Sequence, residues 1–276
     1  MRVALGQLPI SSVPQVNLDR VRAATASAAA QGAQLAVFPE GTQVRFSADL
    51  RAAAEPLDGP FCQGLAAAAR SAGVAIVASL FEPAPGGRVY NTTVGYEADG
   101  SLAAVYRKIH LFDALGYRES DSVAPGDELV VATLAGLRVG FMTCYDVRFP
   151  ELARALAAAG AELLVVPTAW AAGPFKEEHW VTLIRARAIE NTIWVAAAGQ
   201  VPDPAEPATK APTGIGRSLL VDPMGVVRLD LGVSADLGIG TVDTAQTANV
   251  RAAIPSLANR RTDILPVGAV VTAPVS

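Results

Sequence analysis

The sequence is poor in cysteine and histidine, with Cys62, Cys144, His110 and His179 as its only examples among 276 residues. Two cysteines are too few for a disulfide framework. Neither of them belongs to a Cys-x-x-Cys motif or to a cysteine and histidine cluster with metal-ligand spacing. The residues themselves therefore indicate a reducing compartment and give no sign of a structural metal site.

The chain also lacks a basic cluster, a long apolar run and a leader-like start. Its net charge is −4, and no group of lysines and arginines is interleaved with aromatic residues. Residues 1–7 enter a strand pattern directly, and no apolar run approaches the length that spans a membrane. These absences argue against nucleic-acid and membrane partners. They favour a small-molecule partner and a cytoplasmic location.

What is present is a repeated alternation of strands and helices. The strand patterns cover residues 2–8, 34–38, 74–80, 88–97, 101–106, 129–133, 137–142, 162–166, 192–198, 217–221, 226–231 and 239–242, and the helical patterns cover residues 17–30, 61–72, 151–159, 177–190 and 247–254. The stretch from Gly32 to Glu40 matches the stretch from Gly160 to Thr168 almost position by position. The chain therefore reads as two similar halves.

Two such halves predict an α/β fold of the α-β-β-α sandwich type. Two mixed sheets would pack face to face, helices would cover the outer faces, and an internal pseudo-two-fold would relate the halves. We expect residues 1–276 to form a single domain, with an irregular tail from about residue 255 that contributes to a dimer interface. Hydrophobic residues make up 51% of the chain, which is enough for a large core.

Cys144 lies where a nucleophile is best presented. An apolar strand ends at Met142, and a helix opens at Phe149-Pro150-Glu151, so the cysteine is expected on a strand-to-helix elbow. Backbone N–H groups after such a turn can hold an oxyanion, and a helix start places positive partial charge near the sulfur. The alternative is a buried structural cysteine, which is common. The repeat places Glu40 at the end of a strand in the other half, so the two side chains can meet.

A cysteine nucleophile needs a base, because only a few per cent of an ordinary thiol is ionised near pH 7. Histidine is the usual base, and His110 and His179 are the only two candidates of that type; Glu40 is the alternative. Lys108 lies in a long polar loop with Glu119. It could stabilise an oxyanion, and Glu119 could orient it. Each of these residues could also be an ordinary solvated group.

Three segments together resemble the nitrilase, or carbon-nitrogen hydrolase, superfamily over nearly the whole chain. Phe38-Pro39-Glu40 is similar to the glutamate motif of that family. The segment from Tyr106 to Asp113 is similar to its lysine motif, and the segment from Cys144 to Leu152 is similar to its cysteine motif. All three occur in the order that the family has.

The resemblance implies a role for each motif residue. Glu40 would be the general base and later the acid, Lys108 would stabilise the oxyanion together with the Tyr145 backbone N–H, Cys144 would be the nucleophile, and Glu119 would be the fourth member. The resemblance also implies the α-β-β-α fold, dimerisation through helices, and no metal or organic cofactor. No histidine is then required.

A second set of residues, Pro167-Thr168-Ala169-Trp170, His179-Trp180 and the segment from Arg185 to Asn191, is similar to the branch that holds omega-amidases and deaminated-glutathione amidases. Those enzymes act on small carboxamides that carry a distant carboxylate, so a basic group should face the pocket, and Arg148 is the candidate. The segment Ala114-Leu115-Gly116-Tyr117 stands where those amidases have a longer loop, which leaves the specificity open. The residues expected to bind substrate are Tyr145, Arg148, Thr168, Ala169, Trp170 and His179.

Three functions remain open from the sequence. The first is a cysteine-dependent amidase that releases ammonia through a thioester. The second is a nitrilase or an N-carbamoyl amino acid amidohydrolase that uses the same residues, and the third is a non-catalytic binding protein of the same fold. The helical segments 149–159 and 180–191 are apolar around more of their circumference than one sheet needs, which predicts a homodimer or a higher homo-oligomer.

Overall fold

The structure is a computed structural model, and it describes residues 1–263. Its strands are β1 (Arg2–Gln7), β2 (Leu35–Val37), β3 (Ala75–Pro83), β4 (Val89–Tyr96), β5 (Leu102–Arg107), β6 (Asp113–Ala114), β7 (Tyr117–Arg118), β8 (Val123–Ala124), β9 (Val131–Leu134), β10 (Leu137–Phe141), β11 (Leu163–Thr168), β12 (Trp194–Gly199), β13 (Leu219–Val221), β14 (Val227–Asp230) and β15 (Asp236–Thr241). Its α-helices are α1 (Pro14–Ala30), α2 (Leu50–Ala53), α3 (Pro60–Ala72), α4 (Pro150–Ala158), α5 (Lys176–Asn191) and α6 (Thr244–Ala253). Short 3₁₀ helices are η1 (Pro85–Gly87), η2 (Glu119–Asp121) and η3 (Cys144–Arg148).

The two large sheets repeat the same pattern of strand pairing. One has the order β15-β1-β2-β3-β4-β5, with β8 beside β4, and the other has the order β9-β10-β11-β12-β13-β14. In each sheet the first pair is antiparallel, the next two pairs are parallel, and the last two are antiparallel. The internal repeat predicted from the sequence is therefore a repeat of topology.

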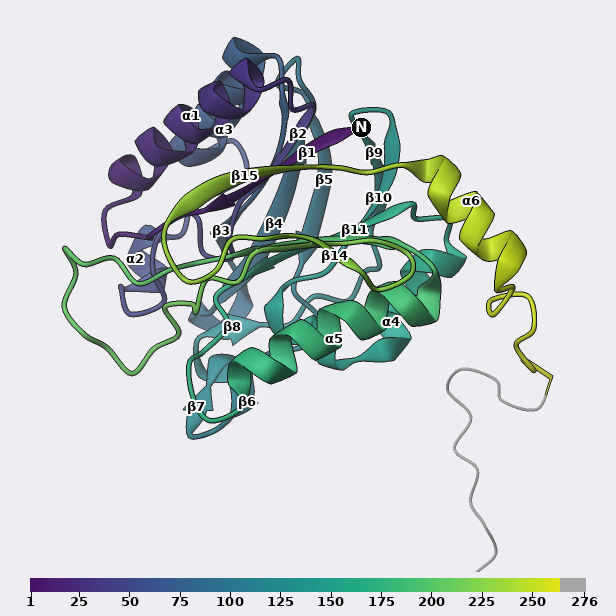
Figure 1. Ribbon diagram of the computed structural model, residues 1–276. Helices are drawn as coiled ribbons and strands as arrows, with labels where there is room; N and C mark the ends of the chain where they lie inside the picture. The colour runs from purple at the N-terminus through teal and green to yellow at the C-terminus, as the bar shows by residue number, and fades with distance from the viewer. Residues whose placement is uncertain (264–276) are drawn as a thin grey trace, which may run out of the picture.

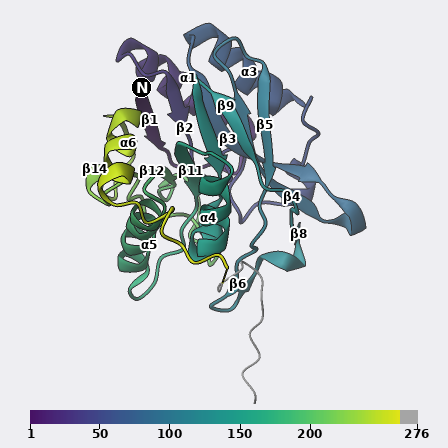
Figure 2. The same cartoon turned by 90° about the vertical axis from the view of Figure 1, so that its right-hand side faces the viewer.

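Helices cover the outer faces of both sheets. Figure 1 shows α1 and α3 on one side of the molecule and α4 and α5 on the other, and Figure 2 shows the sheets between these layers. The prediction of an α-β-β-α sandwich is confirmed. Three of these helices begin with proline, at Pro14, Pro60 and Pro150, because a first-turn residue needs no N–H partner. The helical patterns in the sequence began one to three residues later.

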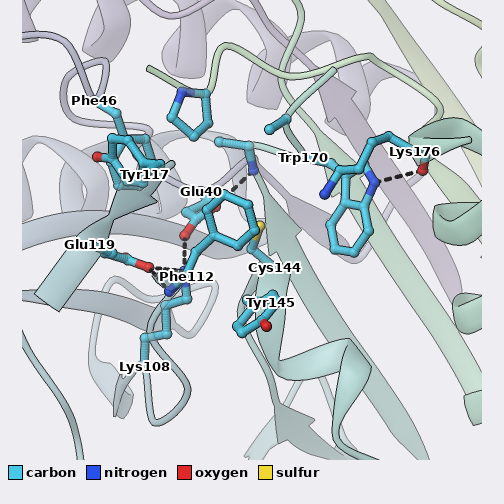
Figure 3. Close-up of a pocket in the computed structure, with 13 residues that line it drawn as sticks. Glu40, Phe46, Lys108, Phe112, Tyr117, Glu119, Cys144, Tyr145, Trp170 and Lys176 are labelled. Atoms are coloured by element: carbon cyan, nitrogen blue, oxygen red, sulfur yellow. Dashed lines mark hydrogen bonds and ion pairs between the residues drawn. The ribbon is translucent and has the colours of Figure 1, made fainter. Parts of the chain in front are cut away.

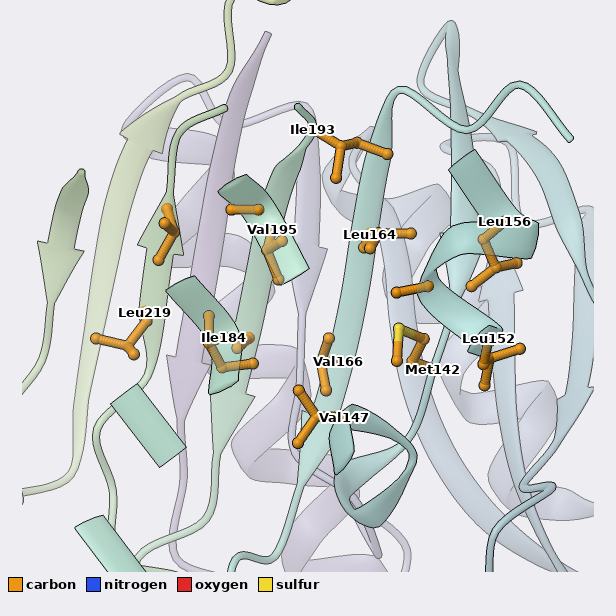
Figure 4. Close-up of a cluster of buried hydrophobic side chains, with 14 of the residues drawn as sticks. Met142, Val147, Leu152, Leu156, Leu164, Val166, Ile184, Ile193, Val195 and Leu219 are labelled. Carbon is orange, nitrogen blue, oxygen red and sulfur yellow. The ribbon is translucent and has the colours of Figure 1, made fainter. Parts of the chain in front are cut away.

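Three apolar layers hold the sandwich together. Side chains of the two sheets pack between them, including Val37 from β2 and Val165 from β11. Leu18 and Leu65 lie in the layer between the first sheet and its helices, and Ile184 lies in the layer between the second sheet and its helices. Figure 4 shows this last layer, where buried residues of α4 and α5 meet those of β11 and β12. Burial on both faces explains why the central strands are continuous apolar runs.

The structure differs from the sequence prediction mainly in the connections. The segment 107–127, expected to be a loop, contains β6, β7, β8 and η2. The elbow after β10 contains η3 before α4 begins, and α2 had no counterpart in the prediction. The described part of the predicted irregular tail, residues 255–263, contains turns without regular elements, while residues 264–276 lie outside the described residues.

Two sets of long-range contacts connect later segments of the chain with its first half. β1 pairs with β15 along its whole length, and the Met1 amino group donates to the Val242 carbonyl at 2.8 Å. In the loop after β12, Glu206 accepts from the Ser11 hydroxyl at 2.7 Å and from Arg45 at 3.1 Å. Within residues 1–263, none of the helices combines the length and apolar character needed to cross a membrane.

Candidate active site

One pocket collects the residues of the three sequence motifs. It encloses about 320 Å³ of empty space, counting its open mouth, and it lies at the carboxyl ends of strands from both sheets. This is the edge where ligand crevices form in α/β proteins. Four chemically active side chains and five aromatic rings line it: Glu40, Lys108, Glu119 and Cys144, with Phe46, Phe112, Tyr117, Tyr145 and Trp170 (Figure 3).

Glu40 follows β2 and is only 1% exposed. Its Oε1 accepts from Lys108 Nζ at 2.9 Å, and its Oε2 accepts from the backbone N–H of Ala169 at 2.8 Å. Ala169 directly follows β11 of the other sheet, so this carboxylate is held jointly by both halves of the chain. The corresponding edges of the two sheets meet at Glu40, as the internal repeat predicted.

Lys108 is buried between two carboxylates. Its Nζ lies 2.9 Å from Glu40 and 2.8 Å from Glu119, and Asn91 Nδ2 donates to the same two carboxylates at 2.8 and 3.1 Å. Burial alone would lower the pKa of Lys108, but the charges of Glu119 and Glu40 outweigh it and hold that pKa well above its usual value. Lys108 is therefore an ammonium at neutral pH. It can stabilise negative charge that develops near Cys144.

Cys144 sits on a strained backbone turn. Its φ angle is +49°, in the left-handed region that residues other than glycine rarely adopt. Asp146 stabilises this turn by accepting from the Thr143 N–H at 2.8 Å, from the Tyr106 hydroxyl at 2.6 Å and from the His110 N–H at 3.0 Å. Since Tyr106 and His110 belong to the lysine motif, Asp146 fixes the cysteine elbow relative to Lys108.

The surroundings of Cys144 favour the protonated form of its thiol. Burial raises its pKa far above the ordinary value, and the negative charge of Glu40 raises it further. Lys108 opposes this rise without reversing it, as does the hydroxyl of Thr168. The nucleophile must therefore lose its proton as it attacks, and Glu40 is the carboxylate whose charge acts on the sulfur. Neither histidine lines the pocket.

The residues expected to bind substrate fall into two groups. Tyr145, Ala169 and Trp170 line the pocket, and Thr168 is fully buried behind it. Arg148 and His179 line an adjacent surface depression instead. Their side chains lie 3.3 Å apart, and the Arg148 guanidinium lies 5.1 Å from the centre of the Trp170 ring.

His110 has a structural role in this arrangement. Its Nδ1 lies 2.8 Å from Asp146, and its ring stacks on Phe149 with the centroids 3.7 Å apart. This fixes the loop that carries Lys108. Neither His110 nor His179 is therefore placed to act as the base for Cys144.

Two polar residues of the site were missed by the sequence reasoning. Asn91 lies in the interior of β4, where nothing in the local pattern marks its side chain as different from its neighbours. Lys176 begins α5 and is followed by two glutamates, which reads as the solvated start of a helix, yet it is only 3% exposed and lines the pocket. A usable signal for Lys176 was scarcity, because the sequence contains only three lysines.

The described residues contain no group of three or more histidine, cysteine, aspartate and glutamate side chains placed to hold a metal ion. The donors of the pocket are two carboxylates already bound to an ammonium, and one thiol. Such a set is arranged for proton transfer and nucleophilic attack.

Comparison with known proteins agrees with this geometry. The family profile described as carbon-nitrogen hydrolase matches residues 2–252. The chain is 43% identical over 268 residues to Hydrolase Rv0480c of Mycobacterium tuberculosis, covering 94% of this chain and 95% of that protein. It is 37% identical over 265 residues to the deaminated glutathione amidase of Escherichia coli O157:H7, covering 95% and 97% of the two chains.

A solved structure shows a similar fold. The amidase of Nesterenkonia sp. AN1, in a glutamate-to-glutamine variant with the acetamide moiety of fluoroacetamide bound covalently to its active-site cysteine, superposes with a TM-score of 0.81. It is 29% identical to this chain, and the match covers 98% of this chain and 97% of the amidase. With the family profile, these relatives and the buried cysteine, glutamate and lysine in one pocket, the chain is a hydrolase that belongs to the carbon-nitrogen hydrolase family.

Proposed function

We propose that the chain hydrolyses a small non-peptide carboxamide to ammonia and a carboxylate, through a thioester on Cys144. The observation that carries this proposal is the placement of Glu40, Lys108, Glu119 and Cys144 in one pocket, where Lys108 is paired with both carboxylates beside the buried thiol. The amidase names among the relatives support the same class of reaction.

In the first half of the proposed reaction, Glu40 accepts the proton of the Cys144 thiol as the sulfur attacks the amide carbon. The carbonyl oxygen becomes an oxyanion, and Lys108 and the backbone N–H of Tyr145 stabilise it. The N–H groups at the start of a helix such as η3 have no partner within the helix, so they are available for this contact. The protonated Glu40 then gives its proton to the leaving nitrogen, and ammonia departs.

In the second half, Glu40 takes a proton from water, and the resulting hydroxide attacks the thioester carbon. The same donors stabilise the second oxyanion. Its collapse breaks the carbon–sulfur bond, releases the carboxylic acid and restores the thiol with the proton held by Glu40. Glu119 contributes by holding the Lys108 ammonium in place through an ion pair of 2.8 Å.

Ammonia release from a substrate panel tests the proposal. The panel contains small aliphatic amides with and without a terminal carboxylate, an N-carbamoyl amino acid and a nitrile, each with wild type and Cys144→Ala. We expect amides to be hydrolysed only by the wild type, with the acyl group on Cys144 detected by mass spectrometry after rapid acid quench. Carbon dioxide released together with ammonia would assign a carbamoylase, and consumption of the nitrile alone would assign a nitrilase. Turnover retained by Cys144→Ala would refute the thioester.

We also propose that the protein works in the cytoplasm as a homodimer. The exposed apolar residues Ile189 on α5 and Met224 and Val226 in the turn between β13 and β14 support an interface on this side. Light scattering at micromolar concentration is expected to give twice the chain mass of 28.4 kDa. A mass of one chain at that concentration would contradict the dimer.

A further inference from the structure

Asn91 donates hydrogen bonds to both carboxylates of the site. It is 1% exposed, and its Nδ2 lies 2.8 Å from Glu40 Oε1 and 3.1 Å from Glu119 Oε1. Both hydrogens of the amide are therefore used. Its Oδ1, in contrast, is buried and accepts no hydrogen bond from any residue that the structure describes. A buried acceptor without a partner is costly, so the amide is placed for what its two N–H groups do.

The backbone of Asn91 is fixed relative to Lys108. Asn91 lies in β4, which pairs with β3 on one side and with β5 on the other, and its carbonyl accepts from the Lys108 N–H at 2.9 Å. A side chain on a paired strand is held more precisely than one on a loop. Asn91 is not one of the residues that line the pocket. It can therefore position the two carboxylates without touching a substrate.

The donors to Glu40 are divided unevenly between its two oxygens. Oε1 accepts from both Asn91 Nδ2 and Lys108 Nζ, whereas Oε2 accepts from the Ala169 N–H. A carboxylate oxygen offers two lone pairs. When the hydrogen bonds of residues 1–263 are counted in this way, Oε1 is full, and Oε2 keeps one lone pair for a further donor.

The thiol of Cys144 is placed to be that further donor. Figure 3 shows the Glu40 carboxylate between Lys108 on one side and Cys144 on the other. Burial is the largest cause that raises the pKa of Cys144, followed by the charge of Glu40, and a hydrogen bond between the thiol and the Glu40 side chain adds to both. The thiol proton therefore meets an oxygen of Glu40 before any substrate binds.

We infer that Asn91 is a positioning residue that closes Oε1 of Glu40 together with Lys108, so that Oε2 is the atom that moves the proton between Cys144 and the leaving nitrogen. This inference rests on the proposed amidase function and concerns the proton transfers within it. The S–H bond breaks as Oε2 gains the proton, and Oε2 loses it again as the nitrogen gains an N–H bond and the carbon–nitrogen bond breaks. The two hydrogen bonds from Asn91 persist throughout.

The first test removes both N–H groups of Asn91 and nearly keeps its shape. Asn91→Leu should lower kcat/KM for a small amide about 10- to 100-fold, as the loss of a hydrogen bond to a charged group does. Asn17→Leu is the matched control, because Asn17 is fully buried and its Nδ2 also donates twice, to the Ser11 and Gln43 carbonyls at 2.8 and 2.9 Å. It should keep kcat/KM within about twofold of wild type. Asn91→Ser is smaller and has one donor, so it should lose less activity than Asn91→Leu, and it replaces that variant if leucine prevents folding.

A double-mutant cycle tests whether Asn91 acts through Glu40. The reporter is the burst of 4-nitrophenolate from a 4-nitrophenyl ester, because this leaving group departs without taking a proton and acylation stays measurable in Glu40→Gln. With glutamate at position 40, Asn91→Leu should slow the burst about 3- to 10-fold, and with glutamine at that position it should slow the burst less than about twofold. A merely structural role would slow the burst equally in both backgrounds.

Equal slowing in the two backgrounds would overturn the inference. An amide kcat/KM that Asn91→Leu leaves unchanged, or that Asn17→Leu lowers just as much, would overturn it as well. Failure of the proposed function has a different signature, because wild type would then release no ammonia from any amide. The ester burst and its dependence on Asn91 and Glu40 would still decide the inference in that case.

Discussion

Replacing Glu40 with glutamine should make Cys144 more reactive and the enzyme less active. Glutamine has nearly the same shape as glutamate, but it removes the negative charge that raises the pKa of the Cys144 thiol. It also removes the carboxylate that we propose as the base for that sulfur. More thiolate should therefore form, while no base remains to move protons during the reaction.

The size of the effect follows from the contact between Glu40 and Cys144. A unit charge about 4 Å from the sulfur, at an effective dielectric constant of about 20, contributes about 4 kcal/mol. Removing it should increase the thiolate fraction at neutral pH roughly 1000-fold. A more acidic thiolate is intrinsically less nucleophilic, which leaves a net increase in alkylation rate of about 30-fold. Loss of the general base should lower amide hydrolysis by about 100- to 10,000-fold.

The assay uses 2-iodoethanol, which alkylates thiols and carries no amide, in a Cys62→Ala background where Cys144 is the sole cysteine. Glu119→Gln is the matched control, because Glu119 is as buried as Glu40 and also pairs with Lys108, whereas Glu40 is the carboxylate that raises the pKa of the thiol. We expect its alkylation rate to change much less. The reasoning would be refuted if Glu40→Gln alkylated no faster than wild type, or if it kept more than a tenth of the hydrolysis.

Three other predictions concern charge elsewhere in the structure. Lys108→Met should lower the free energy of unfolding by about 3–5 kcal/mol, measured by urea denaturation, because two buried carboxylates lose their ammonium. Hydrogen bonds from the Ser12 N–H and neighbouring hydroxyls lower the pKa of Glu206 from 4.5 to about 2, so its ionised form stabilises the fold above that range and this contribution is lost as pH falls through it. Glu206→Gln should therefore flatten the acid side of a stability profile. Burial lowers the pKa of Lys176, the charge of Cys144 opposes this and Arg148 adds to it, so in Cys144→Ala an NMR titration should show the Lys176 ammonium losing its proton at a lower pH than an exposed lysine.

Each of these has a result that counts against it. A Lys108→Met protein as stable as Lys210→Met, a matched change at an exposed lysine, would mean that the carboxylates find other partners or take up protons at little cost. An unchanged acid profile in Glu206→Gln would mean that this carboxylate is not held by the serines in solution. A Lys176 that titrates at the same pH as exposed lysines would mean that its ammonium is solvated.

The sequence predicted the fold well because short segments of the chain determine each strand and helix, and because the same pattern occurs in both halves. Buried strands followed by amphipathic helices give the layers, and the match between residues 32–40 and 160–168 gives the repeat. Helix starts were less well predicted, since the prolines that begin α1, α3 and α4 lie outside the apolar periodicity. The short strands between Arg107 and Asp127 were missed, since each contains only two residues.

The site was predictable where it coincides with a motif and unpredictable where it depends on tertiary contacts. Glu40, Lys108 and Cys144 follow strand ends whose direction the pattern reveals. Asn91 contacts carboxylates that are 51 and 28 positions away, so no local pattern could reveal its role. Lys176 was missed because the two glutamates after it are typical of a solvated helix start. Which basic group faces the pocket depends on how the α5 entry folds over Trp170.

The pairing of β1 with β15 has a consequence for how the protein is made on the ribosome. Arg2 leaves the exit tunnel long before its partner Thr241, because the two residues lie far apart along the chain. Until then β1 has β2 on one side and an open edge on the other, which is the kind of strand that pairs with other nascent chains. Assembly of the first sheet can be completed only after β15 has been synthesised, so we expect the nascent chain to depend on chaperones that shield exposed strand edges.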